Sequence, residues 1–430
     1  MKRTIFLLLI ALQSQAQQVF TSVDQFTEYA LKQNVSLQQA VLNEKIEQQN
    51  RNSAISPLLP SISASAALND NLILNTSLIP AEIFGGTKGT FKEVQFGTKY
   101  NINPNGSFSL NLINGANYGN LMVARKNMQV AAQKTAVLRD QLKAQIAQAY
   151  YLCLLYQKNV QFASENQSNA DSLFHIVSIR YNNQFVDELE WNRARNAAFN
   201  ASSSRRQSEL AYQKALNQLK LLAAIPANQT VEIKDAIAYS ASTPVFGNIG
   251  QRPIMRQAQL QEEAGKLTLT RERLRFLPEL SVYGNYGWNA QGNSLNFKSE
   301  QWYKNSLVGI RLDVPIFSGA IRYFNVEKAR LNEQIARLQQ EQVAFEAAKN
   351  DRDLLLEFNK SRDDVSTLQQ QLTMASRNYQ LALLKYKNEA LNYDNLVSVN
   401  NELLNTQQQL LQAEANYVTV QYQIKLNSGY

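Results

Sequence analysis

Cysteine and histidine are almost absent from this sequence. Its 430 residues include one cysteine, Cys153, and one histidine, His175. A disulfide framework and a zinc site of cysteine and histidine both need more of these residues than the chain contains. The sequence also lacks a catalytic-triad motif, a glycine loop that cradles phosphate and a cluster of metal ligands. We therefore expect no catalytic residue, no metal site and no cofactor, and an enzyme is the function that the sequence favours least.

Glycine and proline are also scarce, at 16 and 9 residues, about half their usual shares. Residues 120–225 and 320–427 contain neither. These runs are far longer than the helices of about 8–20 residues in most globular proteins. A heptad seam runs through the second: Val365, Leu368, Leu372, Ala375, Tyr379, Ala382 and Tyr386. We predict that each run forms one helix out and one helix back, with turns near residues 182–188 and 387–393.

Charged residues are fewer than usual, at 18% of the chain, against roughly 25% in a typical soluble domain. The formal net charge is +8. The basic residues are spread along the predicted helices and form no patch, so nucleic acid is not an expected partner. The mean hydropathy of −0.35 excludes a membrane protein built from many apolar helices.

The first 16 residues have the organisation of a secretory signal peptide. A basic start, Met1 to Arg3, precedes an apolar run from Ile5 to Leu12, and small residues occupy positions 14 and 16. The run is too short to span a bilayer, which needs about 20 helical residues. A buried N-terminal helix is the alternative. The signal peptide predicts an exported protein that begins at Gln17 and, because no cysteine follows the run, carries no lipid.

The sequence contains an internal duplication. Leu59-Pro60 aligns with Leu277-Pro278, and farther along Gly115-Ala116 aligns with Gly319-Ala320. The first pair is separated by 218 residues and the second by 204. The first copy therefore has a longer insertion between its Leu-Pro and Gly-Ala motifs. We predict a first repeat at 17–247 and a second at 248–430, each with a helix, a β-hairpin and a long helical hairpin.

The segments that flank the loop in each repeat alternate between apolar and polar residues. We predict β-hairpins at about 61–114 and 279–316. The apolar positions of their outgoing strands are Ile62, Ala64, Ala66 and Leu68 in the first copy and Leu280, Val282, Gly284 and Tyr286 in the second. Strands of a transmembrane β-barrel have this period, and so do half-buried strands of a soluble sheet, so alternation alone leaves both open.

The number of strands bears on this choice. Four strands per chain fall short of the roughly eight that a membrane barrel needs. An open four-stranded sheet in lipid would leave its edges without hydrogen-bond partners. A membrane barrel must therefore be shared among identical chains, and three chains would supply twelve strands.

These features together resemble the TolC-like outer-membrane efflux protein family, over essentially the whole mature chain. In that family the first helix of each half ends in Leu-Pro, as at Leu59-Pro60 and Leu277-Pro278. The return strand ends in a Pro-hydrophobic-Phe-x-Gly turn, which residues 315–319 match and residues 112–115 match more loosely. Each motif is common by itself, but their duplicated order is specific.

The resemblance implies a mainly α fold with a shared membrane β-barrel. It implies a homotrimer, with a twelve-stranded barrel in the outer membrane and a long α-helical barrel extending through the periplasm. The helical tips would dock on a periplasmic adaptor that belongs to an inner-membrane pump or exporter. Cargo would pass by passive conduction after an iris-like opening of the tips. The implied partners are other copies of the chain, the adaptor, the pump or exporter, and outer-membrane lipid. An envelope coiled-coil protein with a structural or adhesive role is the alternative function.

The helical tips depart from the family pattern at its glycine. Residues 180–187 and 385–392 resemble the pattern Arg-Tyr-x-x-Gly-x-hydrophobic-Ser, but Gln184 and Glu389 replace the glycine. Either the turn has a different shape, or the neighbouring Asn183 and Asn388 adopt the left-handed conformation instead. The residues that we expect to contact the adaptor are Asn183, Gln184, Val186, Asn388, Glu389 and Leu391. Ordinary packing at the tip is the alternative.

Glu190 and Asp394 are candidate acids of the periplasmic entrance. In some members of the family an acidic residue six positions after the tip glycine narrows the entrance. The first copy has Glu190 at this position, whereas the second has Asn395, preceded by Asp394. We predict that these two carboxylates favour cations, and solvated carboxylates on a helix face are the alternative. The sequence does not indicate the cargo or whether the 71–104 loop is ordered.

Overall fold

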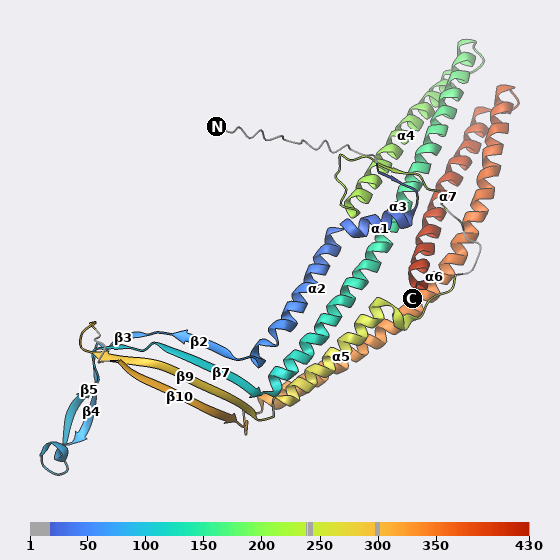
Figure 1. The fold of residues 1–430 in the computed structure, drawn as a ribbon. Coiled ribbons are helices and arrows are strands. Elements are labelled where there is room, and N and C mark those ends of the chain that lie inside the picture. Colours follow the sequence, from blue (N-terminus) through green and yellow to red (C-terminus); the bar gives the residue numbers. More distant parts are fainter. Residues whose placement is uncertain (1–17, 238, 240–243, 297–301, 430) are drawn as a thin grey trace, which may run out of the picture. The chain divides into compact units, whose positions relative to one another are not determined.

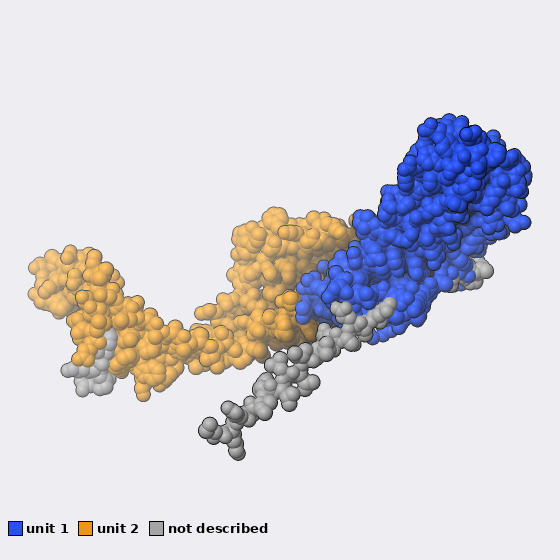
Figure 2. All heavy atoms as spheres, turned by 90° about the horizontal axis from the view of Figure 1, so that it is seen from above, with its two compact units in different colours: residues 1–43, 132–257, 340–430 blue, residues 44–131, 258–339 orange. Residues whose placement is uncertain are grey.

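The computed structural model describes residues 18–237, 239, 244–296 and 302–429, so the predicted signal peptide lies outside the described residues. The chain forms two compact units, which Figure 2 colours separately. Unit 1 contains Met1–Asn43, Ala132–Gln257 and Gln340–Tyr430, and unit 2 contains Glu44–Ala131 and Ala258–Gln339. Both predicted β-hairpins belong to unit 2 and both helical turns to unit 1, so each predicted repeat contributes to both units.

Unit 2 contains one β-sheet made from the two predicted hairpins (Figure 1). Its strands are β2 (Ser61–Ser65), β3 (Leu68–Asp70), β6 (Tyr100–Ile102), β7 (Asn105–Ile113), β9 (Glu279–Gly292) and β10 (Trp302–Asp313). β2 and β3 lie along the first predicted strand and β6 and β7 along its return, so four strand paths result, as predicted. β7 pairs with both β2 and β9, and β9 pairs with β10, all antiparallel. The two hairpins are therefore joined side by side, with β2 and β10 at opposite edges.

The register places apolar side chains on one face of this sheet and polar side chains on the other, because side chains alternate along a strand. Ile62, Phe108, Gly284 and Val308 form one cross-strand row. The next row, on the opposite face, contains Ser63, Ser107, Asn285 and Leu307. The hydroxyl groups of Ser63 and Ser107 are hydrogen-bonded at 2.6 Å across β2 and β7.

The long loop of the first repeat is ordered as a second, smaller hairpin. It consists of β4 (Asn75–Pro80), the 3₁₀ helix η2 (Ala81–Phe84) and β5 (Phe91–Phe96). The pairing of β4 with β5 is antiparallel and forms a separate two-stranded sheet. Figure 1 shows this hairpin beyond the ends of β3 and β6. The longer insertion in the first copy therefore has a structure of its own.

The helices of unit 2 pack closely where glycine faces a neighbour. They are the second half of α2 (Val35–Ser53), the start of α3 (Gly115–Asn182), most of α5 (Pro253–Leu274) and the start of α6 (Ile321–Lys387), with the 3₁₀ helix η1 (Ser56–Leu58) before β2. A Cβ atom at Gly119 of α3 would lie 2.6 Å from Cγ of Arg271 on α5. Lys126 of α3 also pairs with Glu263 of α5 at 2.7 Å. Glycine therefore permits a separation of α3 and α5 that a larger residue would prevent.

Unit 1 is built from long helices and one small sheet. It contains α1 (Val23–Gln33), α4 (Glu188–Leu222), α7 (Tyr393–Ser428), the longer parts of α3 and α6, and the 3₁₀ helix η3 (Ile249–Gln251). Its sheet pairs β1 (Gln18–Phe20) with β8 (Val231–Ile233) in parallel. None of the helices in the described part of the chain has an apolar stretch long enough to cross a membrane.

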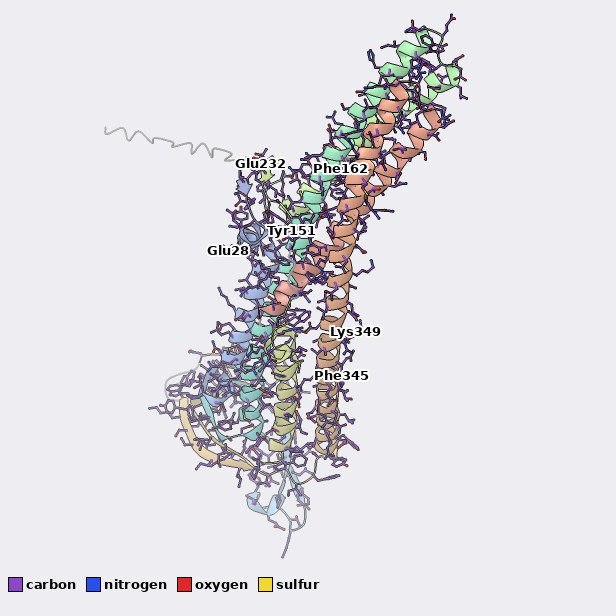
Figure 3. The ribbon with its side chains drawn as sticks, turned by 90° about the vertical axis from the view of Figure 1, so that its right-hand side faces the viewer. Glu28, Tyr151, Phe162, Glu232, Phe345 and Lys349 are labelled. Carbon is purple, nitrogen blue, oxygen red and sulfur yellow. The ribbon has the colours of Figure 1, made fainter. Side chains whose placement is uncertain are left out.

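The predicted heptad seam is buried in unit 1. Along α6, Val365, Ala375, Tyr379, Ala382 and Tyr386 are each at most 7% exposed. Tyr151 of α3, which is labelled in Figure 3, belongs to the same unit, and its ring lies 5.9 Å from that of Tyr150 and 6.4 Å from that of Tyr422. The small residues of the seam let the helices approach, and the tyrosines fill the space between them.

A buried charge connects the segment between the repeats to the helices of unit 1. Glu414 of α7 is 0% exposed. Its carboxylate accepts hydrogen bonds from Nζ of Lys158 at 2.7 and 2.8 Å and from the hydroxyl of Tyr239 at 2.5 Å. These partners offset the cost of removing the carboxylate from water. Tyr239 belongs to the segment that follows β8, so this hydrogen bond fixes that segment to α7.

Candidate functional site at the helix tips

The two helical turns of unit 1 have the same backbone structure. Gln184 has φ of 63° and Glu389 has φ of 60°. The amide of Phe185 donates to the carbonyl of Arg180 at 2.9 Å, and the amide of Gln184 donates to that of Tyr181, also at 2.9 Å. This pair of hydrogen bonds is the Schellman ending of a helix, which requires a left-handed residue just after it. Of the two alternatives for these turns, the left-handed conformation at Asn183 and Asn388 is wrong, because Gln184 and Glu389 adopt it themselves.

The helix that follows each turn begins with a side-chain cap that sequence reasoning missed. Oδ1 of Asp187 accepts from the amide of Glu190 at 2.8 Å, and Oδ1 of Asn392 accepts from the amide of Asn395 at 2.9 Å. Asp and Asn are strong N-cap residues, so their position before an apolar helix was the available signal. The left-handed residue and the cap together fix the conformation of both turns.

The predicted adaptor-contact residues fall into two groups. Asn183, Gln184, Asn388 and Glu389 are exposed at the turns. Val186 and Leu391 are half-buried and pack against an apolar cluster that includes Leu173, Val177, Tyr379, Tyr386, Tyr393 and Leu396. The polar members of the set are thus available to a partner, whereas the two apolar members contribute to the tip's own packing.

Glu190 lies against the other repeat. Its carboxylate accepts a hydrogen bond from the hydroxyl of Tyr386, a residue of α6 that is 1% exposed. Burial, followed by the hydrogen bond to Glu190, raises the pKa of Tyr386 above its ordinary value. The tyrosine therefore stays protonated and remains a donor at neutral pH. This contact joins α4 of the first repeat to α6 of the second.

Asp394 makes a second contact between the repeats. Its carboxylate lies 2.6 Å from Nη2 of Arg193 on α4. The guanidinium of Arg193 also lies over the ring of Tyr393, 5.4 Å from its centroid. The two side chains of the ion pair are 45% and 68% exposed, so solvent and salt screen their attraction.

Arg180 forms a third connection at the end of α3. It lies over the ring of Tyr386 at 5.0 Å, and its Nη1 donates to the carbonyl of the same residue at 3.3 Å. Its Nη2 is also 3.6 Å from a carboxylate oxygen of Glu389. The structure therefore places both predicted entrance acids, and one predicted contact residue, in contacts that hold the two helical hairpins together. Sequence reasoning identified the acids but not their partners Tyr386 and Arg193, because the partners lie in the other repeat.

No group of three or more histidine, cysteine, aspartate or glutamate side chains gathers into a metal-binding arrangement among the residues that the structure describes. The contacts described at the tips are apolar packing, hydrogen bonds and ion pairs.

Comparison with known proteins identifies the family. The profile described as "Outer membrane efflux protein" matches residues 27–224 and 249–428. The chain belongs to this family. The match has two segments with a gap where the predicted repeats meet, and it confirms the resemblance to TolC-like proteins. The family consists of efflux proteins of the outer membrane and is not a family of enzymes.

The chain is also similar to individual members of the family. It is 24% identical over 309 residues to the cation efflux system protein CusC of Escherichia coli strain K12. This match covers 70% of this chain and 66% of CusC. The match therefore spans slightly less than two thirds of that relative.

Solved structures resemble the fold over nearly the whole chain. The crystal structure of the CmeC outer membrane channel of Campylobacter jejuni has a TM-score of 0.78 at 18% identity, covering 95% of this chain and 85% of CmeC. The outer membrane protein VceC of Vibrio cholerae has a TM-score of 0.76 at 16% identity, covering 95% and 96%. The predicted fold class, mainly α with long helices and four β-strand paths per chain, is confirmed.

Proposed function

We propose that this protein is the outer-membrane exit duct of a multi-component efflux or secretion system. Cargo would be handed over by an inner-membrane pump or exporter through a periplasmic adaptor, and would then pass by passive conduction. The observation that carries the proposal is the sheet of unit 2 in a member of the outer membrane efflux protein family. This sheet has one apolar face, one polar face and two edges that are unpaired among the described residues.

The apolar face favours a position in lipid. Ile62 and Val308 are each 81% exposed in the single chain, and Ile310 is 72% exposed. Exposed apolar side chains in register across four strands are costly in water and favourable in a bilayer. The opposite face carries serine and asparagine, which suit an aqueous interior.

The edges of the sheet favour an assembly of copies. Within the described sheet, β2 pairs with β7 alone and β10 with β9 alone, so each presents an unpaired row of backbone groups. Unpaired groups in hydrocarbon cost several kcal/mol each. Pairing β2 of one copy with β10 of the next removes both edges, and we propose that three copies close a twelve-stranded barrel.

Apolar side chains on α6 also favour neighbouring copies. Phe345 is 75% exposed in the single chain and is labelled in Figure 3. Leu356 and Leu338 of the same helix are 65% and 59% exposed. Large apolar side chains on one long helix of an exported protein are expected to be covered by another chain. We propose that the helices of adjacent copies pack along α6.

The tips are the part of the molecule that we propose for the adaptor. Asn183, Gln184, Asn388 and Glu389 are exposed at the two turns, and the turns themselves are fixed by Schellman bonds and caps. A rigid, repeated turn suits recognition, because little conformational entropy is lost on binding. Glu190 and Asp394 remain our candidates for acids of the entrance, and separation of their contacts would accompany opening.

The first test is the native mass of the mature protein extracted from the outer-membrane fraction. We expect a species of three chains that needs detergent for extraction and dissociates on heating, and that forms channels in planar bilayers. A soluble monomer or dimer in the periplasm would contradict the proposal and favour a coiled-coil envelope protein instead.

A further inference from the structure

The polar face of the sheet in unit 2 has an uneven distribution of charge. Most of its positions carry hydroxyl or amide side chains, namely Ser61, Ser63, Asn105, Ser107, Ser109, Asn111, Ser281, Asn285 and Asn305. In the part of the sheet that the structure describes, the charged side chains of this face are Glu279, Arg311 and Asp313. All three lie near the end of β9 and β10 that adjoins the helices.

These three residues form two adjacent layers of opposite sign. Glu279 of β9 and Asp313 of β10 are directly opposite each other, and Arg311 is opposite Ser281. Arg311 and Asp313 are two residues apart on one strand, so their Cα atoms are about 6.7 Å apart along it. An acidic layer therefore adjoins the helices, a basic layer follows, and the rest of the face is neutral over the residues that the structure describes.

A cation–π contact with Tyr283 positions Arg311, the residue of the basic layer. The guanidinium of Arg311 lies over the ring of Tyr283, 5.0 Å from its centroid. The end of that ring crosses the neighbouring strand at Gly309, where a Cβ atom would lie 2.8 Å from Cζ of Tyr283. The absence of a side chain at Gly309 makes room for the ring, and the ring holds the guanidinium by a cation–π contact. Arg311 is thus a positioned cation on the polar face.

A closed barrel of twelve strands is narrow enough for this cation to act electrostatically on ions at its axis. Twelve strands about 4.8 Å apart and tilted by about 40° close into a backbone cylinder of radius roughly 12 Å. The polar face points inward in such a barrel. A guanidinium on that face therefore lies within about one Debye length of the axis, a length that is roughly 8 Å at physiological ionic strength. A ring of them would act on every ion that passes.

We propose that Arg311 is a selectivity residue of the duct, a basic ring held by Tyr283 that opposes the acidic ring of Glu279 and Asp313. This inference rests on the proposed function, because it needs the barrel to close around an aqueous path. The three charges together set how strongly the duct discriminates between anions and cations. The neutral remainder of the polar face lets polar solutes of either charge pass.

The test is the reversal potential of reconstituted channels in a gradient of KCl. For Arg311→Gln we expect the permeability ratio of potassium over chloride to rise by a factor of about three or more, because the acidic layer is no longer opposed. For Asp313→Asn we expect a change in the opposite direction. Arg311→Lys keeps the charge and should keep most of the wild-type ratio. Lys304→Gln is the matched control, since Lys304 is a cation on the same strand but on the apolar face.

The outcomes separate this inference from the proposed function. If the wild type conducts and Arg311→Gln has the wild-type ratio, Arg311 is not a selectivity residue, although the duct stands. If Lys304→Gln shifts the ratio as much as Arg311→Gln, the effect does not depend on the polar face and the inference is again overturned. If Arg311→Gln fails to assemble, as judged by its native mass, the other two variants test the inference. A lower ratio in Asp313→Asn together with a retained ratio in Arg311→Lys would support it, and an unchanged ratio in Asp313→Asn would overturn it. If the wild type forms no channel, both proposals fall.

Discussion

At the scale of single residues, Gln184 and Glu389 show that a residue with a side chain can occupy the left-handed position of a Schellman ending. Both have positive φ, and both lie in a turn with the hydrogen bonds of a Schellman ending. A left-handed conformation costs a residue with a side chain roughly 1–2 kcal/mol. The caps and the buried tip cluster must supply the energy that holds these residues there.

This strain gives a prediction for Gln184→Gly and Glu389→Gly. Each change removes the left-handed cost but adds the chain entropy of glycine, about 0.5–1 kcal/mol, so we expect a net stabilisation of about 0.5–1 kcal/mol. The measurement is thermal unfolding followed by circular dichroism. Asn183→Gly is the matched control, because Asn183 is adjacent but does not have positive φ. Equal effects at 183 and 184 would show that the strain is absent.

The tip residues also show what the sequence could and could not predict. The positions of the turns followed from the heptad pattern and the tip motif. The conformation of Gln184 did not, because propensity favours asparagine in the left-handed region and the two asparagines are next to the turn. The partners of Glu190 and Asp394 could not be found from the sequence, because Tyr386 and Arg193 are about two hundred residues away in the chain.

At the scale of elements, successive side chains of β10 alternate between the apolar face of the sheet, proposed to lie in lipid, and the polar face, proposed to line water. Val308 is on the apolar face, opposite Gly284, and Leu307 is on the polar face, opposite Asn285. The two residues are adjacent, apolar and exposed in the single chain, at 81% and 52%. They therefore provide a direct comparison of the two faces.

We predict that Val308→Arg prevents stable insertion and Leu307→Arg does not. An arginine on the lipid face of a barrel costs about 2–4 kcal/mol near the middle of the bilayer, whereas the inner face is in contact with water. The measurement is the yield of heat-labile assembly from the outer-membrane fraction, compared between the two variants. Equal yields would mean that the sheet does not have one face in lipid.

The elements differ in how well the sequence predicted them. The long helices and the four strand paths were predicted because glycine-free runs, heptads and duplicated alternation extend over many residues. β1 and β8 were not predicted, since each has only three residues and pairs with a segment about two hundred residues away. The hairpin of β4 and β5 was not predicted because its strands do not alternate regularly between apolar and polar residues. The two strands also pair only with each other in the described structure, so the comparison of the two repeats did not reveal them.

At the scale of the whole molecule, the polar contacts of Tyr386, Arg193 and Arg180 connect the tips of the two helical hairpins, beside the apolar cluster that both hairpins share. Their strengths differ because their burial differs. Tyr386 is 1% exposed and its hydrogen bond to the half-buried Glu190 is partly shielded from solvent, and a hydrogen bond to a charged group contributes about 1.5–3 kcal/mol. The ion pair of Arg193 and Asp394 is largely solvated, with exposures of 45% and 68%, and such a pair contributes about 0–1 kcal/mol. The hydrogen bond of Tyr386 should therefore contribute more than the ion pair.

If opening of the duct separates the tips, Tyr386→Phe should open it more than Asp394→Asn. Phenylalanine keeps the ring in the apolar cluster but removes the donor to Glu190, which should favour the separated tips by about tenfold or more. We expect a larger mean conductance in planar bilayers, and the increase should persist in concentrated salt. The smaller effect of Asp394→Asn should disappear there, because a Debye length of about 3 Å at 1 M screens an exposed pair. Wild-type conductance in Tyr386→Phe, with an unchanged native mass, would show that this contact does not hold the entrance closed.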